Sequence, residues 1–231
     1  MLILGIDTSG KSGGITLAQG DRQSFRVVES APIAGGTFSA QLVPAIAALL
    51  EKRGFAARDI GGFAAASGPG SFTGLRVGLS AVKGLAEALG APIATASLLE
   101  ALASLSSGPG TVAAALDAGR SEVFFGLYRV SAAGEATRIN EALLSQSAFL
   151  QHLDDGNLQG AITSDHPLAL LAAAERSSVQ IQVAERPGSE MIARLGLRKL
   201  LNGETVSVEA LDATYMRRSN AEIFSADKDK R

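Results

Sequence analysis

The stretch Ser67-Gly68-Pro69-Gly70-Ser71-Phe72-Thr73-Gly74-Leu75-Arg76-Val77-Gly78 lies between an apolar run at 62–66 and a helical pattern that reaches about Leu89. The apolar run predicts a buried strand. The Gly-Pro-Gly predicts a sharp strand-to-helix turn, because glycine adopts backbone angles that other residues resist and proline fixes one angle. Ser71 or Thr73 can cap the N–H groups at the helix start. Two interpretations stay open, an anion cradle and a tight turn that only brings strand and helix together.

The helix predicted at 72–89 is apolar or small over about two-thirds of its girth, which is more than one sheet face requires. Its charged side chains are confined to a narrow strip at Arg76, Lys83 and Glu87. Glycines are poor helix formers, so Gly74 and Gly78 indicate close approach of another backbone. The pattern predicts a second close neighbour for this side of the helix, which comes either from this chain or from another.

The composition predicts a globular protein with a substantial core. The chain has 231 residues, 46% of them hydrophobic and 19% charged, with a net charge of −2. This charge gives no basic footprint for nucleic acid. The absence of cysteine excludes disulfides, thiol catalysis and zinc–thiolate sites. The start of the chain is too short and uncharged for a signal peptide, and no apolar run is long enough for a membrane span, so we expect a soluble cytoplasmic protein.

The order of predicted elements repeats about halfway along the chain. The first series has strands at 2–6, 14–18 and 23–29, a helix at 38–52, a strand at 62–66, a helix at 72–89, a strand at 91–94 and a helix at 98–105. The second has strands at 111–116, 122–130, 136–143 and 159–163, helices at 147–153 and 167–174, a strand at 179–183 and a last helix at 189–202. Asp7 and Asp117 follow equivalent first strands.

This repeat predicts an α/β fold of two related halves that face each other across a cleft. The best boundary is the Ser-Ser-Gly-Pro-Gly run at 106–110. We therefore predict a first domain at 1–106, a second at 107–204 and a tail at 205–231. The last helix, at 189–202, is a candidate to pack back on the first domain.

A strand followed by Asp7-Thr8-Ser9 and a second strand is typical of actin-like phosphotransferases. Asp7 would take Mg²⁺ there, and Thr8 and Ser9 would contact phosphate oxygens. The alternative is that Asp7 only caps a turn. The facing loop, Asp117-Ala118-Gly119-Arg120, lacks hydroxyls, and the second half has no paired glycine turn for an adenosine. Half of an ATP site is present at best, so we expect no required cofactor or metal, and at most weak ATP or ADP binding.

No other catalytic constellation is complete. The only histidines, His152 and His166, lie in different elements, so the zinc-peptidase spacing is absent. Neither Ser67 nor Ser71 sits in a Gly-x-Ser-x-Gly pattern. The predicted fold is one that enzymes use, but the sequence lacks a complete set of catalytic residues. This combination favours a role that depends on a partner.

The stretch at 67–78 resembles the signature of the TsaB (YeaZ) family, with Ala65-Ala66 before it and Gly84-Leu85-Ala86 after it. Three further segments are similar to motifs of the same family, which extends the resemblance over nearly the whole chain: Ile3-Leu4-Gly5-Ile6-Asp7-Thr8-Ser9, Ala115-Leu116-Asp117-Ala118-Gly119-Arg120-Ser121-Glu122-Val123 and Tyr215-Met216-Arg217. One motif departs. The family often has a His-Ser pair before its Leu-Pro, where this chain has Gly36-Thr37-Phe38-Ser39 before Leu42-Val43-Pro44, so no role of that histidine is transferred.

The resemblance implies an actin-like, ribonuclease H-like fold with mixed sheets and a non-catalytic paralogue of the transferase TsaD. It implies a heterodimer with TsaD, joined by the ATPase TsaE, in threonylcarbamoylation of adenosine 37 of tRNAs that read codons beginning with A. It also implies a homodimer when the chain is alone, and only indirect contact with tRNA. The two long helices of the first half would form the interface. The residues that we expect to bind the partner are Phe38, Leu42, Ile46, Phe72, Thr73, Gly74, Val77, Gly78, Ala81 and Leu85. Asp7, Thr8, Ser9 and Asp117 would be a vestigial nucleotide site. The rival hypothesis is an ATP-dependent small-molecule kinase or ATPase.

Overall fold

The structure is a computed structural model that describes residues 1–155, 157–168, 179, 181–213 and 216. The first half contains β1 (Leu2–Asp7), β2 (Ser12–Gly20), β3 (Phe25–Ala34), α1 (Phe38–Arg53), η1 (Ala57–Asp59), β4 (Gly62–Gly68), α2 (Phe72–Leu89), β5 (Ile93–Ser97) and α3 (Leu98–Ala103). The rest of the described chain contains β6 (Gly110–Gly119), β7 (Glu122–Val130), β8 (Ala136–Ser145), α4 (Gln146–Asp155), β9 (Gly160–Thr163), β10 (Ile181–Val183) and α6 (Ser189–Leu201).

The two sheets have the same topology. The first has the order β3-β2-β1-β4-β5 and the second β8-β7-β6-β9-β10 when read in the same sense. In the first sheet the central strand β1 pairs antiparallel with β2 on one side and parallel with β4 on the other. In the second sheet β6 pairs in the same way with β7 and β9. Asp7 ends β1, and Asp117 lies near the end of β6. The predicted repeat of two actin-like halves with mixed sheets is confirmed.

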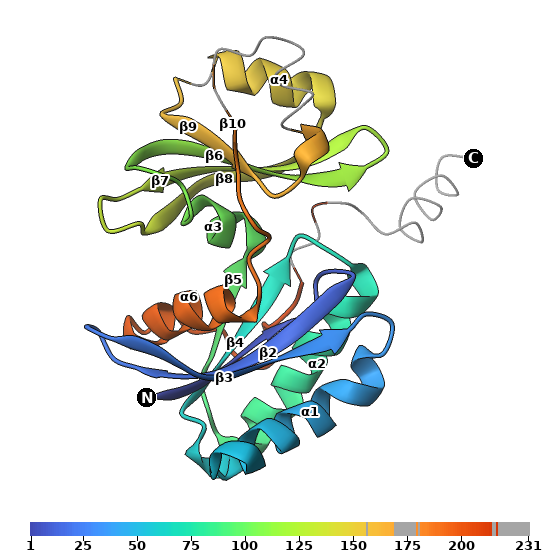
Figure 1. Cartoon of the computed structure of the whole chain (residues 1–231), viewed down its shortest axis with the longest axis vertical. Coiled ribbons are helices and arrows are strands. Elements are labelled where there is room, and N and C mark those ends of the chain that lie inside the picture. Colours follow the sequence, from blue (N-terminus) through green and yellow to red (C-terminus); the bar gives the residue numbers. More distant parts are fainter. Residues whose placement is uncertain (156, 169–178, 180, 214–215, 217–231) are drawn as a thin grey trace.

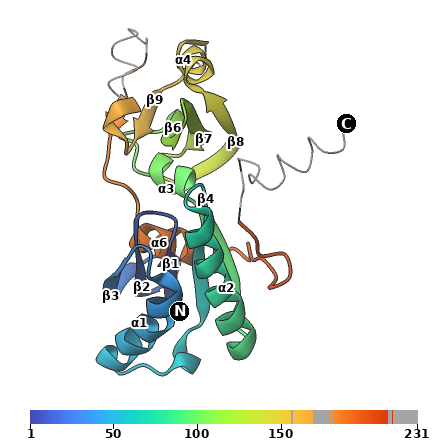
Figure 2. The ribbon, with the colours of Figure 1, turned by 90° about the vertical axis from the view of Figure 1, so that its right-hand side faces the viewer.

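Helices α1 and α2 cover one face of the first sheet (Figure 2). Their inward residues recur at helical spacing, so that each helix turns one apolar stripe to the sheet. The buried residues are Phe38, Leu42, Ile46, Leu49 and Leu50 in α1 and Gly74, Leu75, Gly78, Leu79, Val82 and Ala86 in α2. Pro44 lies inside α1.

Helix α6 covers the opposite face of the first sheet, although it follows the second sheet in sequence (Figure 1). Glycines on the sheet allow it to approach closely. A Cβ at Gly5 would lie 2.6 Å from Ala193 Cβ, and one at Gly62 would lie 2.5 Å from Leu200 Cδ1. Gly196 on the helix meets Ala64 in the same way. Real Cβ atoms do not approach so closely, so glycine is required at Gly5 and Gly196, whereas at Gly62 the flexible end of Leu200 can move aside.

The two halves share one core. Helices α3 and α6 lie between the two sheets, and α4 covers the outer face of the second sheet (Figures 1 and 2). One buried cluster runs from Ala64 and Ala94 in the first sheet through Leu99, in α3, and Ile192, in α6, to Tyr128 in the second sheet. The outer core of the second half contains Phe125 and Phe149. Because of this shared core, the division at 1–106, 107–204 and 205–231 stays a proposal.

Some boundaries differ from the predicted ones. Strand β3 extends to Ala34, beyond the predicted end at residue 29, because it pairs with β2 as far as Ser12. Helix α3 ends at Ala103 rather than at 105. Most of the helix predicted at 167–174 lies outside the described residues, as do Tyr215 and Arg217. None of the helices in the described part of the chain has the apolar length needed to cross a membrane.

Candidate functional site

The glycine-rich turn at 67–71 packs against the loop that follows β1. Ser71 donates its backbone N–H to Ser9 O at 2.7 Å, and Gly70 has no room for a Cβ beside Ser9 O. Ser71 also caps α2, because its Oγ accepts the N–H of Gly74 at 3.2 Å. Both N–H groups are thus used within the chain, which supports the tight-turn interpretation over the anion cradle.

The glycine side of α2 has its second close neighbour in this chain. Thr8 donates its hydroxyl to Gly74 O at 2.7 Å, and a Cβ at Gly78 would collide with Thr8 Oγ1. Within the chain Gly74 and Gly78 are both buried under the end of β1, and their contact with a partner stays a prediction. The physical reason for the glycines is close approach to Thr8.

Three predicted partner-binding residues of α1 are also buried in the core. Phe38 is 6%, Leu42 1% and Ile46 4% exposed, and all three pack against the first sheet. The apolar spacing in the sequence identified the inward face of the helix. Because the sheet covers these three side chains within the chain, their contact with a partner stays a prediction.

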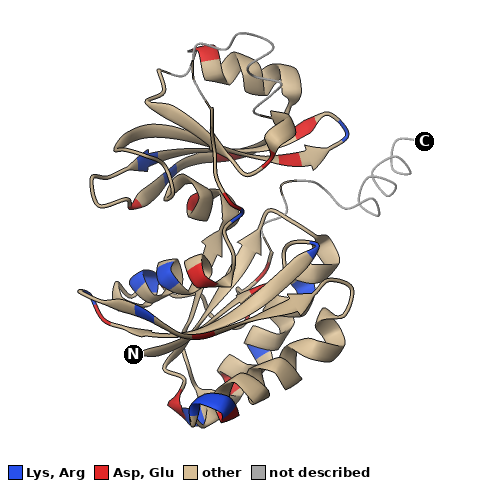
Figure 3. Cartoon of the chain, in the orientation of Figure 1, with Lys and Arg blue, Asp and Glu red and all other residues tan. Residues whose placement is uncertain are grey.

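The outward apolar residues of α1 and α2 form what we call the two-helix surface. The two helices contact each other (Figure 2). Of the predicted residues, Phe72 and Thr73 are exposed, and Val77, Ala81 and Leu85 are half-buried. The sequence reasoning missed four exposed residues of α1: Val43, Pro44, Ala47 and Ala48. Their signal was the opposite stripe of the same helical wheel. The charged side chains of α1 lie only at its C-terminal end (Figure 3).

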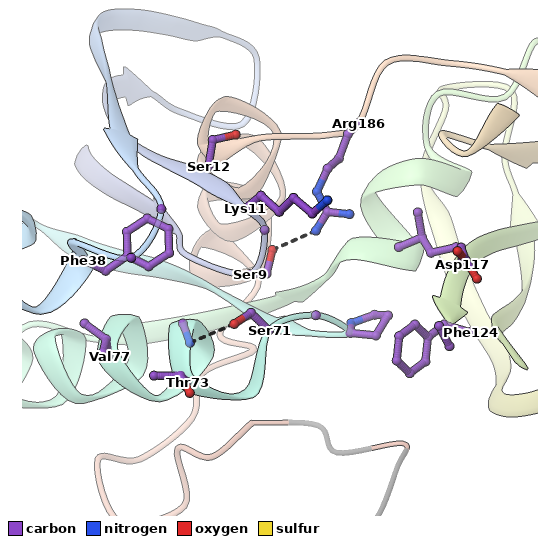
Figure 4. Close-up of a pocket in the computed structure, with 18 of the residues that line it drawn as sticks. Ser9, Lys11, Ser12, Phe38, Ser71, Thr73, Val77, Asp117, Phe124 and Arg186 are labelled. Atoms are coloured by element: carbon purple, nitrogen blue, oxygen red, sulfur yellow. Dashed lines mark hydrogen bonds between the residues drawn. The ribbon is translucent and has the colours of Figure 1, made fainter. Parts of the chain in front are cut away.

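A cavity of about 930 Å³ opens between the halves, beside the start of α2 (Figure 4). Its first wall has Ser9, Lys11 and Ser12 from the β1–β2 loop. A second wall has Asp117, Phe124 and Asp165 from the second sheet. The remaining lining residues include Phe38, Ser71, Thr73, Val77 and Arg186. Of the predicted vestigial nucleotide site, Ser9 and Asp117 line this cavity.

Asp7 is buried and engaged within its own loop. It is 3% exposed, and its Oδ1 accepts the Ser9 N–H at 2.9 Å and also the Ser9 hydroxyl. Arg186 then donates from Nη2 to Ser9 Oγ at 3.1 Å. Asp7 lines a smaller cavity of about 380 Å³, whose lining also includes Arg186. The Thr8 hydroxyl, which was predicted to contact phosphate, donates to Gly74 O instead, and the predicted Mg²⁺ role of Asp7 stays a prediction.

The acidic wall is also held by backbone groups. Asp117 Oδ1 accepts the N–H of Gly119 at 2.8 Å, and Asp165 Oδ2 accepts the N–H of Asp117 at 2.7 Å. Arg120 and Ser121 have φ values of 58° and 57°, so the loop beyond them turns through the left-handed region. Sequence reasoning missed Lys11, Asp165 and Arg186. Arg186 has no local signal, since it lies in the connection between β10 and α6.

The described cavity lining contains no acid–base–nucleophile set. Neither histidine lines it, and His152 binds Ala148 O through Nδ1 at 2.8 Å on the exposed side of α4. Within the described residues, no group of three His, Asp, Glu or Cys side chains is placed to hold a metal. The charged side chains and serine hydroxyls that line the cavity can form hydrogen bonds and ion pairs with a polar ligand.

A polar cluster lies at the junction of the halves, around a cavity of about 590 Å³. Glu100 accepts from Lys199 Nζ at 2.6 Å and lies 3.5 Å from Arg198 Nη2.

A second carboxylate, Glu141, accepts two hydroxyl groups in the same cluster. Ser97 donates its hydroxyl to Glu141 Oε1 at 2.5 Å, and Tyr128 donates its hydroxyl to the same atom. Burial, together with the nearby Glu141 charge, raises the pKa of Tyr128 far above its usual value. Ser97 caps α3 by accepting the N–H of Leu99, and Glu100, in the same helix, accepts from Lys199 of α6.

Two actin-like α/β halves with a cavity between them define the class of protein. A family model described as "TsaD: tRNA N6-adenosine threonylcarbamoyltransferase" matches residues 32–189, more than half of the chain. The chain belongs to this family, and its curated relatives place it with the TsaB (YeaZ) members.

The curated relatives carry the name "tRNA threonylcarbamoyladenosine biosynthesis protein TsaB". The Bacillus subtilis protein is 36% identical over 130 residues, which is 56% of this chain and 56% of that protein. The Escherichia coli protein is 26% identical over 190 residues, which is 78% of this chain and 81% of that protein. The match to the first of these relatives therefore spans little more than half of its length.

Two solved structures from Pseudomonas aeruginosa resemble the whole fold. One, described as an uncharacterized protein with similarity to peptidase YEAZ, has 27% identity and a TM-score of 0.73, and the match covers 94% of this chain and 99% of that one. The other, described as YeaZ, has 25% identity and a TM-score of 0.72, with 93% and 99% covered. The family resemblance seen in the sequence is confirmed.

Proposed function

We propose that the chain is a non-catalytic subunit in the biosynthesis of threonylcarbamoyladenosine in tRNA. It binds a TsaD transferase, and the ATPase TsaE joins that pair. The complex modifies adenosine 37 of tRNAs that read codons beginning with A, and tRNA contacts this subunit only indirectly. Family membership and the names of the relatives support the process. The incomplete chemistry of the described cavity lining supports the non-catalytic role.

The two-helix surface is the observation that carries the proposal. Val43 is 53% exposed and Phe72 38% exposed, and small residues such as Ala47 and Gly84 lie open on the same two helices. A Cβ at Gly84 would meet nothing within 4 Å. An exposed apolar area with few charges at its centre is typical of a protein–protein interface. The same surface is available for self-association when the transferase is absent.

The test is a pair of matched arginine substitutions. Val43→Arg adds a charge to the two-helix surface, whereas Ile139→Arg adds one to β8 in the other half, at a residue that is 50% exposed. Each variant is co-expressed with the TsaD of the same organism, and the complex is measured by size-exclusion chromatography with light scattering. We expect Val43→Arg to weaken the complex by about 100-fold or more, because a buried unpaired charge costs several kcal/mol. Ile139→Arg is expected to co-elute normally.

Retention of the complex by a folded Val43→Arg variant, with Ala47→Arg giving the same result, contradicts the proposed surface. Loss of the complex in the Ile139→Arg variant would move the interface to the second half. The rival kinase or ATPase hypothesis predicts ATP turnover by the purified chain alone, abolished by Asp7→Ala. No observation favours that rival, because Asp7 and Thr8 are already engaged within the chain.

A further inference from the structure

The cavity of about 590 Å³ at the junction of the halves is separate from the cavity beside the start of α2. The described residues that line the one do not line the other. This cavity lies between the C-terminal end of α6 and the hairpin of β7 and β8, on the side of the junction away from the β1–β2 loop (Figures 1 and 3). We call it the junction cavity. Its volume is in the range of small-molecule sites.

Ser67 presents a hydroxyl group to the junction cavity. The residue lines the cavity from the end of β4 and is only 7% exposed. Its hydroxyl forms no hydrogen bond with the described part of the chain, where no fully buried side-chain oxygen or nitrogen lacks a partner. The hydroxyl therefore lies in the small exposed area of this residue, at the cavity surface. A nearly buried hydroxyl without a partner in the chain needs one from a ligand or from solvent.

Glu141 directs one carboxylate oxygen into the same cavity. Its side chain is 5% exposed, and Oε1 accepts the hydroxyls of Ser97 and Tyr128. Oε2 accepts no hydrogen bond from the described residues, since Arg138 Nη1 lies 3.8 Å away, beyond hydrogen-bond distance. By the same reasoning as for Ser67, Oε2 lies at the cavity surface. It can accept a donor from a ligand.

The floor of the junction cavity has an excess of negative charge. Glu141 and Glu100 are 5% and 10% exposed, and Lys199, the least exposed cation among the described lining residues, is 19% exposed. Lys199 donates to Glu100 Oε2 at 2.6 Å and to Thr95 O at 2.9 Å. Its charge is paired with Glu100, whereas Glu141 has hydroxyl donors and the distant Arg138. A carboxylate in this position favours a cationic group from a ligand.

The rim of the junction cavity has two arginines that are held by long contacts. Arg138 is 64% exposed and Arg198 is 28% exposed. Their ion pairs with Glu100, Glu135 and Glu141 measure 3.5, 3.6 and 3.8 Å, longer than charge-assisted hydrogen bonds. Glu135 is 57% exposed, so solvent screens its charge more than that of Glu141. An arginine can bind a carboxylate through two parallel N–H groups.

We propose that the junction cavity binds a small zwitterion, a free amino acid. The ammonium group donates to Glu141 Oε2 at the floor, and the carboxylate binds the arginines at the rim. Neutral polar groups also line the cavity, from Ser67, Thr95 and Asn202. They suit a side chain that forms hydrogen bonds without carrying a charge. The site rests on neither the transferase nor the two-helix surface, so its failure would leave the proposed function untouched.

The test compares three matched compounds on the full chain, labelled with ¹⁵N. L-Glutamine carries both charges and a neutral polar side chain, 4-aminobutanamide lacks its carboxylate, and glutaramate lacks its ammonium group. We expect L-glutamine to shift amide resonances of residues 95–100 and 198–204. Each of the other two should bind about tenfold more weakly or worse, because it loses one charge-assisted contact. Equal affinity of L-glutamine and either analogue overturns the zwitterion.

Three substitutions assign the binding to these side chains. Glu141→Gln keeps an acceptor for the Ser97 and Tyr128 hydroxyls but removes the charge, and should weaken L-glutamine binding by about tenfold or more. Arg138→Gln should weaken it by about threefold or more. Ser67→Ala should weaken it without lowering the melting temperature, because no described group of the chain uses that hydroxyl.

Arg129→Gln is the matched control, since Arg129 is exposed on β7 and lies outside the described cavity lining. It should change the dissociation constant less than about twofold. Circular dichroism shows whether each variant is folded, and the surface substitution Arg138→Gln keeps the test decisive if Glu141→Gln does not fold. Two further results overturn the site. One is an affinity that neither Glu141→Gln nor Arg138→Gln changes. The other is that none of the common amino acids, at millimolar concentration, shifts the resonances of residues 95–100 and 198–204.

Discussion

Thr8 donates its hydroxyl to the carbonyl oxygen of Gly74 at 2.7 Å, and so joins the end of β1 to the first turn of α2. This bond requires the helix to pass very close to the strand end. Gly74 and Gly78 of α2 allow this contact, because a Cβ at either position would collide with Thr8.

A methyl group at Gly78 should therefore destabilise the fold. It would collide with Thr8 Oγ1, so we expect Gly78→Ala to lower the free energy of unfolding by about 1–3 kcal/mol despite the better helix propensity of alanine. Gly84→Ala on the same helix is the matched control, because its Cβ meets nothing within 4 Å. It should raise stability by up to about 1 kcal/mol. Urea denaturation of both variants checks the pair, and equal effects would contradict the close contact.

Removal of the Ser71 cap should weaken the start of α2. Ser71 Oγ accepts the N–H of Gly74, so we expect Ser71→Ala to cost about 1 kcal/mol of unfolding free energy. Ser80→Ala, at an exposed position within the same helix, has no such bond to lose and should be neutral or slightly stabilising. Thermal denaturation of the two variants in parallel distinguishes a capping effect from a general effect of serine replacement.

Tyr128 should make stability fall at alkaline pH. Its pKa is raised in the folded chain, whereas an unfolded chain releases that proton near pH 10. The stabilisation is thus complete below about pH 10 and is lost above it, at up to about 1.4 kcal/mol per pH unit. We expect Tyr128→Phe to remove this part of the pH dependence, and to cost about 1–3 kcal/mol at neutral pH because Glu141 loses a donor. The measurement is the free energy of unfolding from denaturant titrations of the unmodified chain and of Tyr128→Phe, at steps of about one pH unit between pH 8 and pH 11. Identical slopes would argue against the buried hydroxyl.

The pair Glu100–Lys199 should couple α3 to α6. Both side chains are mostly buried, at 10% and 19% exposed. Lys199→Met leaves a carboxylate with only Arg198 nearby, and we expect a loss of about 1–3 kcal/mol. In a double-mutant cycle with Glu100→Gln, the second substitution should cost clearly less than it does alone. Additive costs would mean that the two side chains contribute independently.

The sequence allowed the repeat, the order of elements along each half and the class of fold to be predicted, because apolar runs and helical spacing are local signals. It also identified Asp7 and Asp117 at equivalent strand ends. Which side chains of α1 and α2 are buried within the chain was harder to predict. The wheel of α2 showed two covered sides but not that Thr8 supplies the second cover, since Thr8 is 66 residues away from Gly74. For α1, the apolar stripe identified the core face rather than the surface that includes Val43.

The position of α6 sets an order of events during synthesis of the chain. One face of the first sheet, with Gly5 and Ala64, is closed by a helix that spans residues 189–201. A nascent polypeptide on the ribosome therefore has all five strands of that sheet long before it has their cover. The amino-terminal half is expected to mature only after nearly the whole chain has been translated, and it should be poorly protected from proteases until then.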